Sequence, residues 1–263
     1  MLILLPPSEG KTPAASGPPV DPAAHWLPAL APARTRVLSR LVAMCKRSSA
    51  RSMADSLATL GLSAGQSDEI RRNAELLSAP AAPAASIYSG VLYEALDAPS
   101  LAPEARAWLD ETAVVFSGLW GVVRLDDRIP AYRCSVGVTL PSVGGLTAYW
   151  KKALPKALDA LPGPILDLRS GAYAAMWAPP AAHAATVRVL HERVVGGETK
   201  RSVVSHFNKA TKGRIVRALA EAGAAPATAD EMIAALRDLK YTVEEQPSAP
   251  GKPRQLDIVV AEL

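Results

Sequence analysis

Residues 117–133 hold the densest group of side chains in this chain that could bind or act on a ligand. Carboxylates and a tyrosine can transfer protons, arginines can bind an anion, and a tryptophan can stack on a planar ligand. The candidates are Ser117, Trp120, Arg124, Asp127, Tyr132 and Arg133. Ion pairs that hold a loop would explain the same charges, and burial would explain Trp120, so both interpretations stay open.

Lys11 lies in a second polar segment, which reads Ser-Glu-Gly-Lys-Thr over residues 8–12. A phosphate loop of the ATPase type needs an earlier glycine, but Leu5 occupies that place, and Pro6 and Pro7 have no amide to donate. This excludes an ATPase loop. Lys11 could still bring an ammonium close to a phosphate, or it could be an ordinary solvated lysine.

Two basic stretches contain no acidic residue. Residues 199–220 include Asn208, Lys209, Lys212 and Arg214, and residues 34–51 carry six Lys or Arg side chains. Lys209 and Lys212 share a helix face, because residues three apart are neighbours on a helix. If both stretches line one groove, a nucleic-acid backbone is a sensible partner. Solvated basic helix faces are the alternative.

Several function classes receive no support. The four histidines and two cysteines show no metal-ligand spacing, so we expect no metal and no cofactor. Net charge is +4, which is compatible with a polyanionic partner. No apolar run is long enough to cross a membrane, and two cysteines suit a reducing compartment, so we expect a cytoplasmic protein. The oligomeric state stays unknown.

The elements that must position these residues alternate between strands and helices. Apolar runs predict strands at residues 2–5, 113–116, 165–168, 186–195 and 202–207, with a turn at Gly196 and Gly197. Helical spacing predicts helices at residues 33–44, 52–60, 68–77, 146–161, 209–222 and 228–239. A final hairpin would pair residues 241–244 with 256–262. We expect one α/β domain over residues 1–263, in which helices flank a single mixed sheet and an N-terminal portion is helical.

Five segments in this order resemble the peroxide-stress YaaA family. They are residues 1–12, 87–93, 117–133, 146–150 with 167–173, and 205–214. The match places Tyr88, Gly90 and Tyr93 in a Tyr-x-Gly-x-x-Tyr element, and Ser170 in the fourth segment. The resemblance implies an α/β domain with a helix-hairpin-helix-like element and a positively charged cleft. It also implies DNA binding and a role in limiting oxidative damage, linked to lower free intracellular iron. Departures in the first loop and after Arg133 indicate a divergent member.

Two functional hypotheses follow. The first is a protein of the peroxide stress response that binds DNA, or another phosphate-bearing ligand, in a basic cleft. The second is an enzyme on a nucleobase, a nucleoside or a phosphorylated small molecule, in a specialised pathway. Its cleft would contain Lys11, Tyr88, Arg124, Asp127 and Lys209, with Lys11, Asp127 and Tyr132 as catalytic candidates. Aspartates favour the second hypothesis, because a groove that only holds phosphates needs none.

Overall fold

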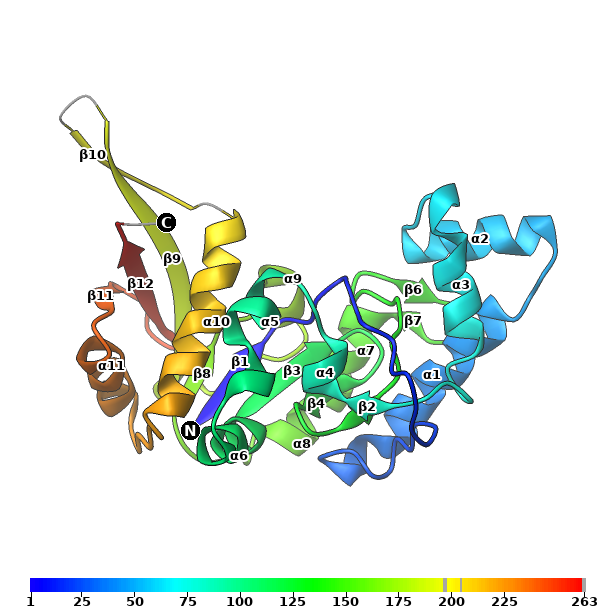
Figure 1. The fold of residues 1–263 in the computed structure, drawn as a ribbon, viewed down its shortest axis with the longest axis horizontal. Coiled ribbons are helices and arrows are strands. Elements are labelled where there is room, and N and C mark those ends of the chain that lie inside the picture. The colour runs from blue at the N-terminus through cyan, green and yellow to red at the C-terminus, as the bar shows by residue number, and fades with distance from the viewer. Residues whose placement is uncertain (196–197, 204, 262–263) are drawn as a thin grey trace.

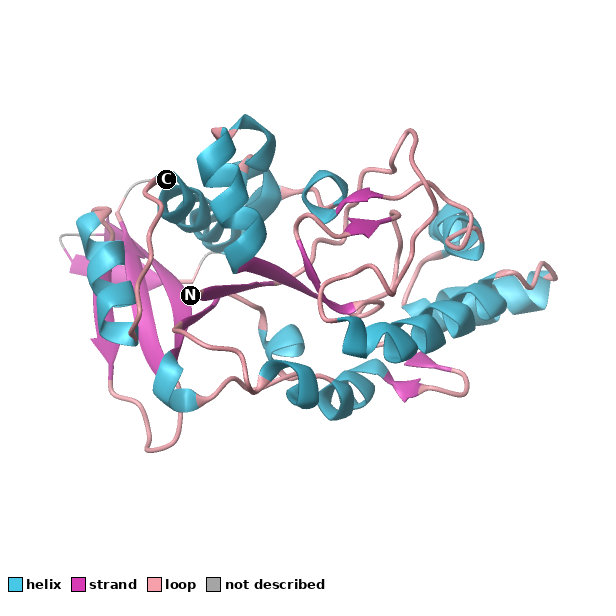
Figure 2. Cartoon of the chain, turned by 90° about the horizontal axis from the view of Figure 1, so that it is seen from below, coloured by secondary structure: helices cyan, strands magenta, loops and turns pink. Residues whose placement is uncertain are grey.

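A computed structural model describes residues 1–195, 198–203 and 205–261. The turn predicted at Gly196 and Gly197 lies outside these residues. Within them the chain forms a mixed α/β structure with helices on both sides of a sheet (Figures 1 and 2). This confirms the predicted fold class. No helix in the described part of the chain is both long and apolar enough to cross a bilayer.

One sheet runs through the centre in the order β11-β12-β9-β8-β1-β3-β4, with β10 paired to β9. Its strands are β1 (Leu2–Leu5), β3 (Ala113–Ser117), β4 (Gly121–Arg124), β8 (Ile165–Asp167), β9 (Ala184–Val195), β10 (Glu198–Ser202), β11 (Thr242–Gln246) and β12 (Arg254–Val260). β1 pairs in parallel with β3 and β8, and β9 pairs in parallel with β8 and β12. β4, β10 and β11 are antiparallel to their neighbours. The central strands β1 and β3 are entirely buried, which explains their continuous apolar sequence.

The helices are amphipathic or short and cover the sheet and its ends. They are α1 (Ala31–Cys45), α2 (Ala50–Leu60), α3 (Ser67–Ala74), α4 (Ala84–Ile87), α5 (Val91–Leu96), α6 (Pro103–Thr112), α7 (Leu146–Ala153), α8 (Pro155–Leu158), α9 (Gly171–Ala174), α10 (Ser205–Glu221) and α11 (Ala229–Asp238). Two small ladders pair β2 (Ala82–Pro83) with β5 (Arg128–Ile129), and β6 (Thr139–Leu140) with β7 (Gly144–Gly145). α1, α2 and α3 form the helical N-terminal portion at one end of the molecule (Figure 1).

Two predicted elements differ from the structure. The helix expected over residues 146–161 is split into α7 and α8, because Pro155 has no amide to continue the helical ladder. The strand expected over residues 202–207 is wrong, since β10 ends at Ser202 and α10 already begins at Ser205. Lys209 therefore lies within α10 and does not begin it.

Candidate functional site

A cavity of about 1020 Å³ opens where β1 and β8 end. Ligands of open α/β sheets bind at this edge, beyond the carboxyl ends of the parallel strands. The loops after β1 and β8 form part of the wall, and the starts of α5 and α10 form another part. Residues 132–137, the end of α2 and the middle of β9 complete it.

Most of the site residues predicted from the sequence meet at this cavity. Those in its wall are Lys11, Gly90, Tyr93, Tyr132, Arg133, Ser170, Asn208, Lys209 and Lys212. Tyr88 and Ser117 lie directly behind the wall, where both bond to the Tyr132 hydroxyl. Trp120, Arg124, Asp127 and Arg214 are not in the wall. Segments far apart in the sequence therefore converge here.

Lys11 is held in the cavity wall by backbone contacts and by an aromatic neighbour. Its backbone forms a β-bridge with Tyr88. Its Nζ donates to the Ser8 carbonyl at 2.7 Å and lies 4.2 Å from the centroid of the Tyr132 ring. Burial and then the nearby Arg133 lower the pKa of Lys11 to about 7. The amine is therefore partly neutral at neutral pH.

A chain of buried hydroxyls lies beneath Lys11. Ser117 Oγ accepts the backbone N–H groups of Leu119 and Trp120, at 3.2 and 3.0 Å. Its own proton therefore goes to Tyr132 Oη, 2.6 Å away, and the Tyr132 proton goes to Tyr88 Oη at 2.9 Å. Burial raises the pKa of Tyr88 and of Tyr132, so both stay protonated donors.

Tyr93 fixes the loop that carries Lys11. Its hydroxyl donates to the Pro6 carbonyl at 2.7 Å, and its ring stacks on Tyr88 at 5.2 Å. Gly90 precedes α5 with a φ of 93°, a left-handed conformation that glycine adopts without strain. These three positions of the Tyr-x-Gly-x-x-Tyr element thus act together to hold the first loop against α5.

Arg133, in the segment after β5, contacts the loop that carries Lys11. Its guanidinium pairs with the Glu9 carboxylate at 2.9 Å. The side chain of Asn73 on α3 holds the Arg133 backbone, donating to its carbonyl at 2.7 Å and accepting its N–H at 2.9 Å. Asn73 is fully buried and was missed by sequence reasoning, because an asparagine within a helix pattern carries no sign of a distant partner.

Lys212 and an ion pair secure the loop after β8. The Lys212 ammonium is buried and donates to the Leu168 carbonyl at 2.9 Å. Asp167 and Arg169 form a buried two-point ion pair, with distances of 2.9 and 2.6 Å. Burial lowers the pKa of Lys212, while the Asp167 charge opposes that change. The ion pair was not predicted as part of the site, although Asp167 stands at a predicted strand end.

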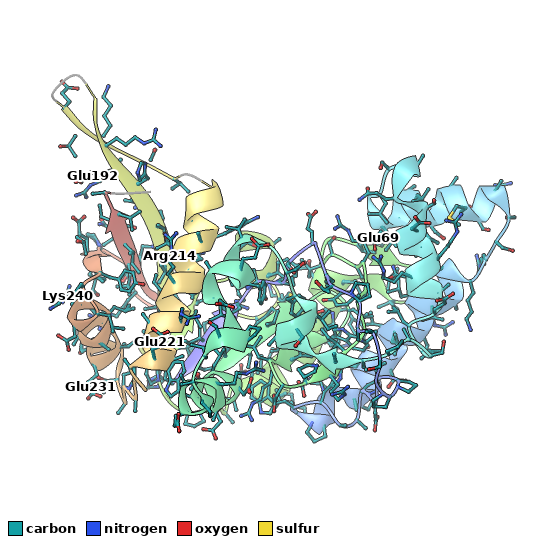
Figure 3. All side chains as sticks on the ribbon, in the orientation of Figure 1. Glu69, Glu192, Arg214, Glu221, Glu231 and Lys240 are labelled. Atoms are coloured by element: carbon teal, nitrogen blue, oxygen red, sulfur yellow. The ribbon has the colours of Figure 1, made fainter. Side chains whose placement is uncertain are left out.

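Lys209 and Asn208 bring polar groups from α10 to the cavity. The Lys209 side chain is exposed. Asn208 Oδ1 is buried and has no hydrogen-bond partner among the residues that the structure describes, which makes it an acceptor available to a ligand donor. Arg214, labelled on the same helix in Figure 3, is not part of the wall. Burial raises the pKa of Tyr241, and nearby Arg214 partly offsets that rise.

Asp127 accepts hydrogen bonds from backbone amides and is not part of the cavity wall. One carboxylate oxygen accepts the N–H of Trp26 at 2.8 Å, and the other accepts the N–H of Arg124 at 2.8 Å. The Arg124 guanidinium lies 4.9 Å from the Trp26 ring. Trp120 is fully buried, with its ring edge-on to His25 and Tyr132, so it cannot stack on a ligand in this conformation. These residues tie the N-terminal loop to β4.

Arg34 departs from the expectation of a solvated or nucleic-acid-binding basic stretch. Its side chain is fully buried in α1. The guanidinium donates to four backbone carbonyls, those of Trp26 and Val122 at 2.7 Å and those of Leu27 and Trp120 at 3.2 Å. Arg34 therefore links α1 to β4 and is closed to a phosphate.

No group of three or more His, Cys, Asp or Glu side chains could hold a metal ion within the described ranges. Cys45 and Cys134 are both buried and free of a disulfide. Burial raises the pKa of Cys45 to about 11 and that of Cys134 to about 12. Although Cys134 borders the cavity, it is a poor nucleophile at neutral pH.

Comparison with known proteins matches residues 1–247 to the family described as peroxide stress protein YaaA. A UPF0246 protein of Streptomyces coelicolor is 49% identical over 269 residues, which covers 100% of both chains. A UPF0246 protein of Corynebacterium efficiens is 42% identical and covers 99% of this chain and 100% of its own. An uncharacterized protein of Campylobacter jejuni is 28% identical over 81% of this chain and 82% of its own.

Proposed function

The chain belongs to the YaaA family of peroxide stress proteins, and on that premise we propose that it binds the phosphate backbone of DNA in the cavity beside Lys11. In this proposal the protein acts in the cytoplasm and limits iron-driven oxidative damage. Its peroxide-stress character follows from the family. DNA binding is supported by the chemistry of the cavity wall.

One observation carries the proposal: cationic side chains from separate segments meet in one cavity. They are Lys11 after β1, Arg133 after β5, Lys209 and Lys212 on α10, Arg169 after β8 and Arg188 on β9. Glu9 is the acidic residue in the same wall. Several of these cations also have protein partners, so the exposed Lys209 is the one best placed to gain from a phosphate.

Neutral polar groups fit the same ligand. The Ser170 hydroxyl borders the cavity, and a hydroxyl can donate to a phosphate oxygen. The unpartnered Asn208 Oδ1 can accept a hydrogen bond from a base or a sugar. A ligand that carries both phosphates and donor groups, as a nucleic acid does, would use both.

The α2–α3 pair would serve as the helix-hairpin-helix-like element of the proposal. Leu60 and Gly61, at the end of α2, border the cavity. Gly61 has a φ of 65° and lets the chain turn sharply toward α3. Through this turn the helical N-terminal portion would contact the same DNA as α10.

The test is a gel shift on duplex and bubble DNA at several salt concentrations. We expect wild-type binding to weaken steeply with salt, and Lys209→Glu to weaken binding to both DNAs and to lower the salt slope by about one phosphate contact or more. Lys152→Glu, an exposed lysine of α7 outside the cavity wall, is the matched control for charge. No binding at low salt, or equal loss in both variants, contradicts the proposal.

The limit on oxidative damage has its own measurement. If the protein covers the DNA backbone, it should slow strand cleavage by ferrous iron and hydrogen peroxide in a region the size of its footprint. Lys209→Glu should protect less than Lys152→Glu at equal concentration. Uniform protection by both variants would indicate that the proteins scavenge radicals without covering the DNA.

An enzyme that acts on a phosphorylated small molecule is the second candidate. The cavity volume lies at the upper end of the range for small-molecule sites, and Lys11 has an unusual pKa. A thermal-shift screen of nucleobases, nucleosides and nucleotides separates the candidates. A stabilising compound whose effect is lost in Lys11→Met, from a protein that does not bind DNA, favours the enzyme. Asp127→Asn is unsuitable here, because Asp127 holds backbone amides outside the wall.

A further inference from the structure

We propose that Lys11 is an amine nucleophile that forms an imine with the C1′ aldehyde of an abasic deoxyribose in the bound DNA. This inference rests on the proposed DNA-binding function and names the damaged nucleotide that the cavity would hold. DNA binding alone would require only a positive charge at Lys11, whereas imine formation requires its amine.

The placement of Lys11 differs from that of a lysine that only attracts phosphate. Its amine lies in the cavity wall, over the Tyr132 ring, and is oriented by the Ser8 carbonyl at 2.7 Å. The Glu9 carbonyl, at 3.4 Å, is a second and weaker acceptor. Attack on a carbonyl carbon needs an amine that faces the ligand space in a fixed orientation, and Lys11 in the cavity wall meets this need.

The surroundings of Lys11, and burial above all, favour the neutral amine. Burial is the main reason that its pKa falls to about 7, and the Arg133 guanidinium adds to that effect. Cys134, Glu69 and Glu9 act in the opposite direction. Because only the unprotonated amine attacks a carbonyl, Lys11 is reactive at a pH where a solvated lysine is not.

The aromatic neighbours of Lys11 do not compete for its proton. Burial raises the pKa of Tyr132 and of Tyr88 well above the ordinary value, so both phenols remain protonated. Lys11 is therefore the member of this cluster that loses its proton near neutral pH. The Ser117 and Tyr132 protons are used within the hydroxyl chain, which holds the Tyr132 ring in place beneath the Lys11 amine.

The ligand must combine a phosphate with an aldehyde. Lys209 and Arg133 border the same cavity as Lys11, so a phosphate-bearing sugar can lie within reach of the amine. An intact nucleotide offers no aldehyde, whereas the ring-opened sugar left by base loss does. Free sugar phosphates share this chemistry, and the experiment includes them as a separate arm.

The reaction balances without an oxidant or a reductant. The lone pair of Lys11 Nζ forms a C–N bond to C1′, and the carbonyl oxygen takes a proton to give a carbinolamine. Loss of that hydroxyl with one further proton releases water and leaves a C=N bond. One amine and one aldehyde thus give one imine and one water.

Borohydride trapping tests the proposal, because hydride reduces an imine to a stable secondary amine. The wild-type protein is mixed with a duplex that carries one abasic site, with the matched intact duplex, and with deoxyribose 5-phosphate. We expect a covalent adduct with the abasic duplex alone, mapped by mass spectrometry to the peptide that contains Lys11. Trapping should rise as the pH passes through about 7, where Lys11 becomes neutral.

Lys11→Arg keeps the positive charge but removes the nucleophile, since arginine stays protonated. We expect Lys11→Arg to lose trapping, while Lys151→Ala, an exposed lysine of α7, keeps both trapping and binding of the intact duplex. An adduct on another amine, trapping retained in Lys11→Arg, or an adduct with the free sugar phosphate alone overturns the proposal. Intact-duplex binding without any trapping overturns this inference alone, whereas absence of all DNA binding overturns the proposed function.

Discussion

At the scale of residues, Lys11 and Lys212 line the same cavity but have different roles. Both have a lowered pKa because both are largely removed from water. Lys212 is committed to the Leu168 carbonyl, beside the charge of Asp167, and so fastens α10 to the loop after β8. Lys11 donates to the Ser8 carbonyl, and the positive charge of Arg133 adds to the lowering of its pKa.

The first prediction concerns Lys11 and pH. Its pKa is 10.5 in the unfolded chain and about 7 in the folded one, so between these values the unfolded chain holds a proton that the folded chain has lost. Stability therefore rises with pH across this window, and the cost of burying the charge is fully present below it. We expect Lys11→Met to raise the melting temperature most at about pH 6 and least at about pH 9.

Differential scanning fluorimetry over this range measures the effect. Lys152→Met, at an exposed site on α7, is the matched control and should show no such dependence. A Lys11→Met gain that stays constant with pH would mean that the folded protein does not lower the pKa of Lys11.

The second prediction concerns Arg34, which donates to the Trp26 and Val122 carbonyls at 2.7 Å from a fully buried position. Arg34→Leu keeps much of the volume but leaves these carbonyls without donors. We expect a loss of about 3 kcal/mol in the free energy of unfolding, measured by urea denaturation. Arg40→Leu, on the exposed side of α1, should change it by less than about 0.5 kcal/mol. Equal effects would show that the Arg34 bonds add nothing.

At the scale of elements, much of the secondary structure follows from local sequence. β1 and β3 are continuous apolar runs because parallel strands are buried on both faces. The helix predicted from residue 228 is confirmed as α11, whose N-cap Thr228 accepts the N–H of Glu231. The terminal pair is confirmed as antiparallel strands β11 and β12.

The change from β10 to α10 could not be predicted in the same way. Every residue of β10 is exposed, so no buried face marks its length in the sequence. α10 is instead fixed by tertiary packing, with Ile215, Val216 and Leu219 buried. The hairpin predicted at Gly196 and Gly197 placed its second strand over residues 202–207, part of which α10 occupies.

The third prediction concerns how closely α10 packs against α5. A Cβ at Gly213 would overlap the Leu92 carbonyl oxygen of α5, so only glycine allows this approach. We expect Gly213→Ala to cost about 1–3 kcal/mol in unfolding free energy, because α10 must move away from α5. Gly65→Ala, whose Cβ would have its nearest neighbour 4.0 Å away, is the control and should be close to neutral. A neutral Gly213→Ala would mean that the two helices pack less closely.

The movement of α10 should also affect the cavity. Asn208, Lys209 and Lys212 all reach the wall from this helix. Gly213→Ala should therefore weaken DNA binding at a temperature where the variant is still folded.

At the scale of the whole molecule, the site joins segments from most of the sequence. The ordered motifs in the sequence indicated candidate site residues in several separate segments. The structure brings three of them, Lys11, Tyr132 and Lys209, to one cavity. The sequence could not separate Asp127, whose carboxylate holds backbone amides, from an acid that faces a ligand. Nor could it show that Arg34 is buried, since a basic residue in a basic stretch looks solvated. In both cases the environment of the side chain depends on partners distant in sequence, such as Trp26 for Asp127 and Val122 for Arg34.

The shape of the molecule relates the site to its surroundings. In Figure 3, Glu69 on α3 and Arg214 on α10 stand on elements toward opposite ends, and the β1 strand runs between them. The cavity wall draws on both sides, with Gly61 from the N-terminal helices and Lys209 from α10. A ligand longer than one nucleotide can therefore contact both ends at once.

Amide hydrogen exchange, measured with and without duplex DNA, tests the central claim most directly because it reports where the DNA lies. The account predicts slower exchange in residues 8–11, 168–173 and 208–212, which contribute to the cavity wall, and no change in α7. The same protection should be weakened in Lys209→Glu. Protection confined to the exposed face of α1, or no protection at a DNA concentration that saturates binding, would contradict DNA binding in this cavity.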